Sequence, residues 1–121
     1  MSKILEHRTA IYNILRATLP AWQIRFEGED LADRAPNAVI SIISDTPYTH
    51  LGYTEEGARL EFSVSLWVPS RMSEALQAEN ASTLALLQDG YRRSYTTSLV
   101  DPEKWYGVVS RYYKVYPKGV C

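Results

Sequence analysis

The clearest pattern along the chain is a strict alternation of apolar and polar positions over residues 58–68. One parity holds the apolar residues Leu60, Phe62, Val64, Leu66 and Val68; the other holds Arg59, Glu61, Ser63, Ser65 and Trp67. Successive side chains of a β-strand point to opposite faces, so this alternation predicts a strand with its apolar parity buried. Pro69 then ends the strand.

Four more strands are predicted. Residues 21–27 alternate in the same way, and residues 38–44 are apolar on both faces, which is typical of an interior strand covered at least in part on both sides. Two further strands, residues 91–100 and 105–116, are joined by a turn at residues 101–104, where Asp101 and Pro102 favour it. Residues 45–57 contain Pro47, Gly52 and Gly57 and form either a long connection or the extended tip of a hairpin.

Two helices are predicted. Residues 3–18 follow a possible cap at Ser2, place Ile4, Ile11, Ile14 and Leu15 on one side, and end before Pro20. Residues 71–89 follow Ser70 as N-cap and end at Asp89-Gly90, because glycine accepts the left-handed conformation there. The apolar residues on one side of this second helix are Met72, Leu76, Leu84 and Leu87. Asn80 is able to cap a fresh helix, which leaves open a break near Glu79-Asn80.

The element order is therefore α-β-β-β-α-β-β, and the fold class is α+β. Strands come in neighbouring pairs, so we expect a mixed or antiparallel sheet of about five strands with both helices packed on one face. A chain of 121 residues fits a single domain, residues 1–121.

Charge and composition exclude several classes of protein. The net charge of −1 argues against a nucleic-acid binder that works by bulk charge. No apolar run is long enough to cross a bilayer, and the N-terminus has no signal-peptide core, so we expect synthesis in the cytoplasm and no membrane partner. The single cysteine, Cys121, excludes an internal disulfide or a cysteine-based zinc site.

The search for chemistry finds no phosphate-binding, nucleophile-elbow or metal-binding motif. His7 is expected to be solvated on the first helix. His50 lies in a segment where we expect no rigidly held partner, which a general base needs. The acidic stretch of residues 27–33 lacks the ligand spacing of a calcium loop, so it is expected to be a solvated loop or a patch that meets a basic partner. We therefore expect no catalytic residue, no cofactor and no metal, and a protein that is not an enzyme.

Aromatic residues supply the candidates for binding surfaces. Nine Tyr and three Trp accompany only two Phe, and Tyr and Trp suit surfaces that become interfaces. Trp67 has the outward parity of the strongest strand, where either a loop of the same chain or a partner covers it. Arg92 and Arg93 fit helix-end electrostatics, a protein interface or, with their neighbouring tyrosines, nucleic-acid binding. The interface candidates are Trp67, Tyr48, Tyr53, Arg92 and Arg93.

In length, in the order of its elements and in the general pattern of its residues, the chain resembles the tail-terminator or tail-completion proteins of long-tailed bacteriophages. The residues that carry the resemblance are the strand Trp22-Gln23-Ile24-Arg25-Phe26 after the first helix, the segment Ala35-Pro36-Asn37-Ala38-Val39-Ile40-Ser41-Ile42, the long strand from Arg59 to Pro69, and the closing strand near Trp105 to Tyr116. The long arms of some family members are not obvious in the sequence.

The resemblance implies a structural virion protein at the head–tail junction, made in the host cytoplasm. Such a protein forms a ring, commonly a hexamer, that caps the tail tube. Its implied partners are further copies of itself, the tail tube protein and the head-completion (neck) protein, with DNA passing through the ring. Two alternatives stay open: a small nucleic-acid-binding or other protein-interaction module, which for nucleic acid would use Arg92, Arg93, Arg111 and exposed tyrosines, and an enzyme of unrecognised type.

Overall fold

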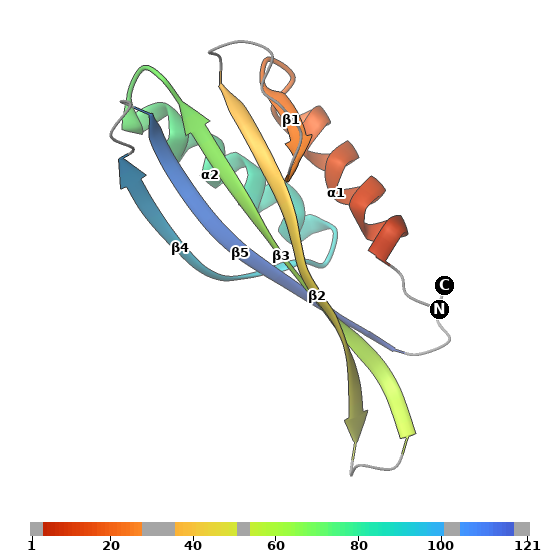
Figure 1. Cartoon of the computed structure of the whole chain (residues 1–121). Coiled ribbons are helices and arrows are strands. Elements are labelled where there is room, and N and C mark those ends of the chain that lie inside the picture. The colour runs from red at the N-terminus through yellow and green to blue at the C-terminus, as the bar shows by residue number, and fades with distance from the viewer. Residues whose placement is uncertain (1–3, 28–35, 51–53, 101–104, 118–121) are drawn as a thin grey trace.

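The computed structural model describes residues 4–27, 36–50, 54–100 and 105–117, and its elements follow the predicted order α-β-β-β-α-β-β (Figure 1). The elements are α1 (Ile4–Thr18), β1 (Gln23–Phe26), β2 (Asn37–His50), β3 (Thr54–Val68), α2 (Met72–Gln88), β4 (Arg92–Val100) and β5 (Tyr106–Pro117). The predictions at Ser2, at residues 28–35, at the turn of residues 101–104 and at Cys121 lie outside the described residues.

The five strands form one mixed sheet in the order β1-β2-β3-β5-β4. β1 pairs with β2 in parallel, and the other three pairs are antiparallel. The predicted α+β class, with a mixed sheet of about five strands, is therefore confirmed. Because β5 enters between β3 and β4, the last strand of the chain lies inside the sheet and β4 lies at its edge.

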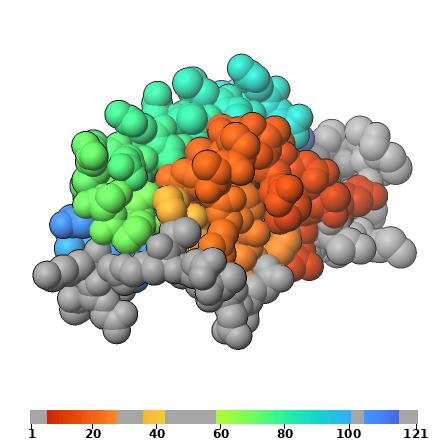
Figure 2. All heavy atoms as spheres, turned by 90° about the horizontal axis from the view of Figure 1, so that it is seen from above, coloured from red at the N-terminus to blue at the C-terminus, as the bar shows by residue number. Residues whose placement is uncertain are grey.

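The core lies between the sheet and the two helices, which lie side by side along one face of it (Figures 1 and 2). The predicted inward parity of β3 is confirmed, since Leu60, Phe62, Val64, Leu66 and Val68 are all buried. Phe62 is flanked by two buried aromatic rings, with Tyr91 edge-on at 5.4 Å and Tyr112 stacked at 5.3 Å between ring centroids. Fully burying each such side chain contributes about 1.5–3 kcal/mol, so this strand anchors the domain.

No described helix covers the opposite side of the sheet, which we call the open face. β2 is interior in the strand order, as predicted, but only one of its faces packs against helices, and Val39 and Ser41 on the open face are half-buried. The alternation and pairing of the strands assign the following described residues to the open face: Gln23, Arg25, Asn37, Val39, Ser41, Arg59, Glu61, Ser63, Ser65, Trp67, Arg92, Tyr95, Thr97, Leu99, Gly107, Val109, Arg111, Tyr113 and Val115.

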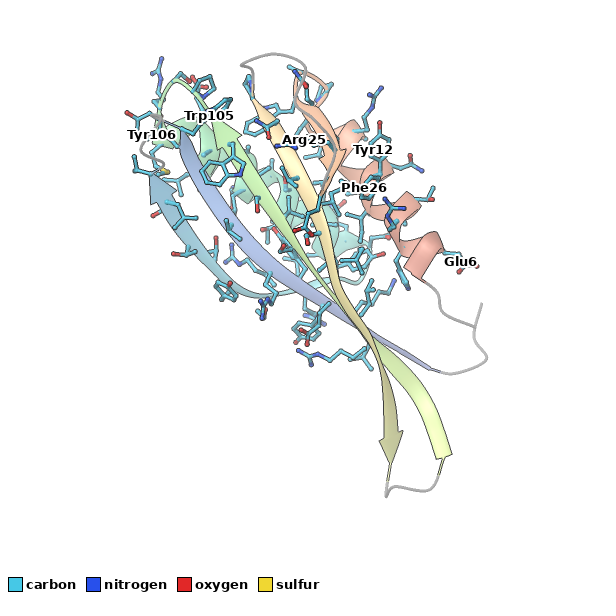
Figure 3. The ribbon with its side chains drawn as sticks, viewed as in Figure 1. Glu6, Tyr12, Arg25, Phe26, Trp105 and Tyr106 are labelled. Carbon is cyan, nitrogen blue, oxygen red and sulfur yellow. The ribbon has the colours of Figure 1, made fainter. Side chains whose placement is uncertain are left out.

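Helix α1 packs through its predicted apolar side. Ile11 and Leu15 are fully buried, and Tyr12 stacks on Phe26 of β1 at 5.9 Å between ring centroids (Figure 3). The guanidinium carbon of Arg8 lies 3.9 Å from the centre of the same Phe26 ring. α1 is thus held to β1 by an aromatic contact as well as by aliphatic burial.

Helix α2 differs from its prediction in three respects. It runs without a break through Glu79 and Asn80. Arg71 rather than Ser70 occupies the N-cap position, and the Ser70 hydroxyl donates to Glu74 Oε2 at 2.7 Å instead. The apolar pattern also misidentified the packed side, because Leu76, Leu84 and Leu87 are exposed. The buried residues of α2 are Ala75, Ala78, Glu79, Ser82, Thr83 and Leu86. The predicted stop is confirmed, with Gly90 at φ 91°.

The described residues of this segment, 45–50 and 54–57, follow the extended-hairpin alternative. β2 continues to His50 and β3 begins at Thr54, with pairing from Asn37 opposite Trp67 to His50 opposite Thr54. Pairing of β3 with β5 ends at Gly57, so the distal ends of β2 and β3 continue as a two-stranded projection beyond the sheet (Figure 1). We call the described residues of this projection, 49–50 and 54–56, the hairpin arm; the sequence had left a hairpin and a long connection open as alternatives.

Candidate assembly surfaces

The main buried polar cluster joins α2 to the edge of the sheet. Glu79 is buried, and its Oε1 accepts hydrogen bonds from Arg93 of β4 at 2.5 Å, from the Thr83 hydroxyl at 2.8 Å and from the Ser110 hydroxyl at 3.2 Å. The Thr83 hydroxyl also lies 2.8 Å from the Tyr112 hydroxyl, whose pKa is raised mainly by burial. These contacts occupy the carboxylate, so the cluster ties β4 and β5 to the helix rather than presenting a free base.

A second polar contact ties α1 to the strand that follows α2. His7 Nδ1 lies 2.9 Å from the Tyr91 hydroxyl, and His7 is half-buried, so the expectation of a solvated histidine is wrong. Burial and, to a lesser extent, the nearby Asp89 carboxylate raise the pKa of Tyr91 to about 12. Because this buried phenol keeps its proton, its hydroxyl is available for the hydrogen bond that connects α1 to the residue before β4.

The open face carries positive charge together with aromatic rings. Arg59 pairs with Glu61 at 2.7 Å and lies over the Tyr113 ring at 4.2 Å. Arg111, in the middle of the face, lies 5.4 Å from the centre of the Tyr95 ring, and its buried Nε has no hydrogen-bond acceptor among the described residues.

Trp67 lies on this open face, as its parity predicted, and is half-buried. It stands directly opposite Gly107 of β5, and a Cβ added to Gly107 would lie 2.5 Å from two carbons of the indole ring. The ring therefore occupies the space that the absent glycine side chain leaves. Part of the burial of Trp67 thus comes from the neighbouring strand β5, a contact that neither predicted cover, a loop or a partner, included.

The edge strand β4 is exposed at all nine residues. Its last residue, Val100, keeps 65% of its surface exposed, and Leu99 is also exposed. On α2, Leu84 and Leu87 follow the exposed Leu76 by eight and eleven positions, which places all three on one side of the helix. Unpaired strand edges and grouped exposed leucines are the surfaces that other chains cover.

The predicted interface candidates fall in different places. Trp67 and Arg92 lie on the open face, whereas Arg93 points to the helix side and pairs with Glu79. Tyr48 belongs to β2, where it pairs with Gly57, but its side chain, like that of His50, is outside the described residues, as is all of Tyr53. Among the described candidates, Trp67 and Arg92 thus share one face of the sheet but lie apart on it, since Trp67 is opposite Gly107 and Arg92 is opposite Tyr113 of β5.

Several important residues were missed from the sequence. Glu79 follows Ala78 on α2 without any motif, and its partners Arg93 and Ser110 lie 14 and 31 residues away. Gly107 looked like an ordinary strand residue. Its position opposite the outward Trp67 would have marked it only if the pairing of β3 with β5 had been known.

The described residues contain no group of three or more His, Cys, Asp or Glu side chains placed to hold a metal ion. Their helices also include none with the length and apolarity of a membrane span. An open hollow of about 310 Å³ lies between the end of α1 and α2, lined by Leu19, Trp22, Glu74, Gln77, Ala78 and Ala81. It contains one carboxylate and no second titratable group, so it offers no paired acid and base.

No protein-family model matches the chain, and no curated protein matches it in sequence.

Proposed function

We propose that this chain is a structural subunit of a long-tailed bacteriophage, forming a ring that caps the tail tube and joins it to the head-completion proteins. The observation that supports it best is the edge strand β4, which is exposed along its whole length beside exposed apolar residues. A free edge of this kind invites pairing with another chain. The resemblance in length and element order to tail-terminator proteins supplies the particular assembly.

Two different surfaces favour a ring over a two-fold dimer. The edge of β4 and the leucines of α2 form one surface, and the basic open face forms another. A contact between unlike surfaces is heterologous, and it closes into a ring when the rotation per subunit divides a full turn. Each copy then uses both surfaces, as a tail-capping ring requires.

The proposed role involves no catalytic step. The buried carboxylate of Glu79 is held by three hydrogen bonds within the fold, and the buried phenols of Tyr91 and Tyr112 keep their protons at neutral pH. These groups stabilise the positions of α2 and the strand edge, which are the parts that would meet a neighbouring subunit.

The test is the oligomeric state of the purified chain, measured by light scattering at several concentrations and imaged by negative-stain electron microscopy. We expect closed rings of a single subunit number with a central opening. Val100→Lys, which places a charge at the free edge, should reduce ring formation at unchanged thermal stability. Ala17→Lys, at an exposed position of α1, is the matched control. A chain that stays monomeric at every concentration, alone and with tail tubes, would contradict the proposal.

A nucleic-acid-binding module is the second candidate, and a specific observation favours it. Arg92 and Arg111 lie on the same open face as Tyr95 and Tyr113, which is the mixture of basic and aromatic groups that single strands bind. Arg93 contributes little to such a surface because it pairs with Glu79. Binding to DNA or RNA that falls steeply between 50 and 200 mM salt would favour this function over the ring.

A further inference from the structure

The side of α2 that faces solvent carries no charged residue. The exposed residues of this helix are all apolar or neutral: Ser73, Leu76, Gln77, Asn80, Leu84, Leu87 and Gln88. Its two acidic residues lie elsewhere, since Glu79 is buried and paired with Arg93, and Glu74 is half-buried. Solvated helix faces normally carry charged side chains, whereas the centres of protein interfaces are depleted of them.

The three exposed leucines of this side, Leu76, Leu84 and Leu87, form what we call the leucine stripe. Leu84 keeps 55% of its surface exposed, and the other two are exposed to a similar degree. Leu87 follows Thr83 by four positions and Leu76 precedes Glu79 by three, so the stripe adjoins the side of α2 that contacts β4 and β5. The stripe therefore extends the exposed edge of the sheet into the helix layer.

The hollow of about 310 Å³ opens on a different side of α2, where this helix lies beside α1 (Figure 2). It is lined by Leu19, Trp22, Glu74, Gln77, Ala78 and Ala81. Its one carboxylate is already paired, because Glu74 Oε2 accepts a hydrogen bond from Ser70 at 2.7 Å and Oε1 lies 3.4 Å from Arg71 Nε. Apolar cavities of about 150 Å³ accept a molecule the size of benzene, so the hollow has room for a leucine side chain.

We infer that the leucine stripe of one copy packs into the hollow of the next copy, with Leu84 and Leu87 as the inserted side chains. This inference rests on the proposed ring and names the surfaces that meet in it. Neither surface offers an unpaired charge, so the two suit each other and neither suits a nucleic acid or a strongly charged protein. The open face of the same subunit stays available for a different contact.

The positions of the two surfaces make the contact heterologous. Stripe and hollow lie on different sides of α2, so every copy donates one and offers the other, and the contact repeats from subunit to subunit. A stripe that met the same stripe of a second copy would instead close the contact after two subunits and leave both hollows unfilled.

Mixing two variants tests this contact. The stripe variant carries Leu84→Glu and Leu87→Glu, and the hollow variant carries Ala81→Glu, which places a second carboxylate beside Glu74. Each variant alone has an altered surface in every contact, so we expect its self-association to be at least about tenfold weaker than that of the unaltered chain.

The one-to-one mixture distinguishes a heterologous contact from a symmetric one. The intact stripe of the hollow variant can enter the intact hollow of the stripe variant, which forms one sound contact and leaves an altered surface at each end. Light scattering of the mixture should therefore show particles of two subunits, one of each variant, and no rings.

Matched controls separate the contact from charge and folding effects. Asn13→Glu with Ala17→Glu, at exposed positions of α1, makes the same change in net charge as the stripe variant and should leave assembly unchanged. Ala81→Ser keeps the hollow open and should also assemble. Urea unfolding should give similar midpoints for all variants, because the altered leucines are exposed and Ala81 is half-buried. Leu84→Gln with Leu87→Gln replaces the stripe variant if the glutamates prevent folding.

The outcomes separate this inference from the proposed function. If both variants form rings as readily as the unaltered chain, the stripe-to-hollow contact is wrong and the ring stands. The contact is equally wrong if the mixture stays monomeric at concentrations where the unaltered chain assembles, or if the stripe variant alone loses assembly. If the unaltered chain never associates, the ring and this contact fail together.

Discussion

Trp67 and Gly107 form a pair whose energetic coupling follows from their geometry. They face each other across β3 and β5, and a Cβ on Gly107 would lie 2.5 Å from Cε3 and from Cζ3 of the indole. Carbon atoms essentially never approach so closely, so Gly107→Ala must displace either the ring or the backbone. Overpacking of this kind costs about 1–3 kcal/mol.

The sign of the effect should reverse once the ring is removed. In a Trp67→Ala background the obstruction is absent, and alanine in the middle of a strand is more favourable than glycine by about 0.5–1 kcal/mol. Gly107→Ala should therefore destabilise the unaltered chain and stabilise the Trp67→Ala chain. The coupling free energy between the two sites, the sum of these effects, is about 1.5–4 kcal/mol.

Urea unfolding of the four proteins, followed by far-UV circular dichroism, measures this coupling without relying on tryptophan fluorescence. Ser63→Ala supplies the control background, because Ser63 is on the same face of the same strand but faces Arg111 rather than Gly107. Coupling of Gly107→Ala to Ser63→Ala should stay below about 0.5 kcal/mol. Equal destabilisation by Gly107→Ala with and without the indole would refute the reasoning, because the ring would then not occupy the space over Gly107.

Two further predictions concern the buried polar contacts. Glu79→Ala should lower the free energy of unfolding by about 2–4 kcal/mol in chemical denaturation, somewhat less than the loss of a fully buried pair, because Arg93 can turn to solvent. Glu79→Gln should cost less, because the amide oxygen is still an acceptor. A loss below about 1 kcal/mol for Glu79→Ala would contradict the assigned cluster. Because the pKa of Tyr91 is raised to about 12, its protonated phenol contributes stability that is complete below about pH 10 and is lost as the pH rises through 12. The free energy of unfolding, measured between pH 8 and 12, should therefore fall by about 3 kcal/mol. In Tyr91→Phe this dependence of the unfolding free energy on pH should be smaller.

The sheet was readable from the sequence because its signals are local and repeated. Five consecutive alternations placed Phe62 and its neighbours in the core and Trp67 on the opposite face, and the structure confirms both. Strand order was not readable in the same way. The position of β5 between β3 and β4 depends on pairings between residues that are far apart in sequence, such as Ser63 with Arg111.

The polar contacts were unreadable for a related reason. The Glu79 carboxylate meets hydroxyl and guanidinium groups from α2, β4 and β5, and no spacing along the chain links them. The basic pair at residues 92 and 93 was identified, but one residue faces the open side and the other the helix side. Adjacent strand residues point to opposite faces, so a pair of charges at neighbouring positions rarely forms one patch.

Helix α2 is the element whose packed side the apolar pattern predicted wrongly. Its buried side mixes alanines with Glu79, Ser82 and Thr83, while its exposed side carries Leu76, Leu84 and Leu87. Small residues let the helix lie close to the sheet, and the hydroxyls and carboxylate on that side bond to one another and to the strands. In the proposed ring a neighbouring subunit would bury these exposed leucines, and the burial would stabilise the contact. A helix that exposes three of its four leucines is what the proposed ring subunit would need at its second interface, beside the free edge of β4.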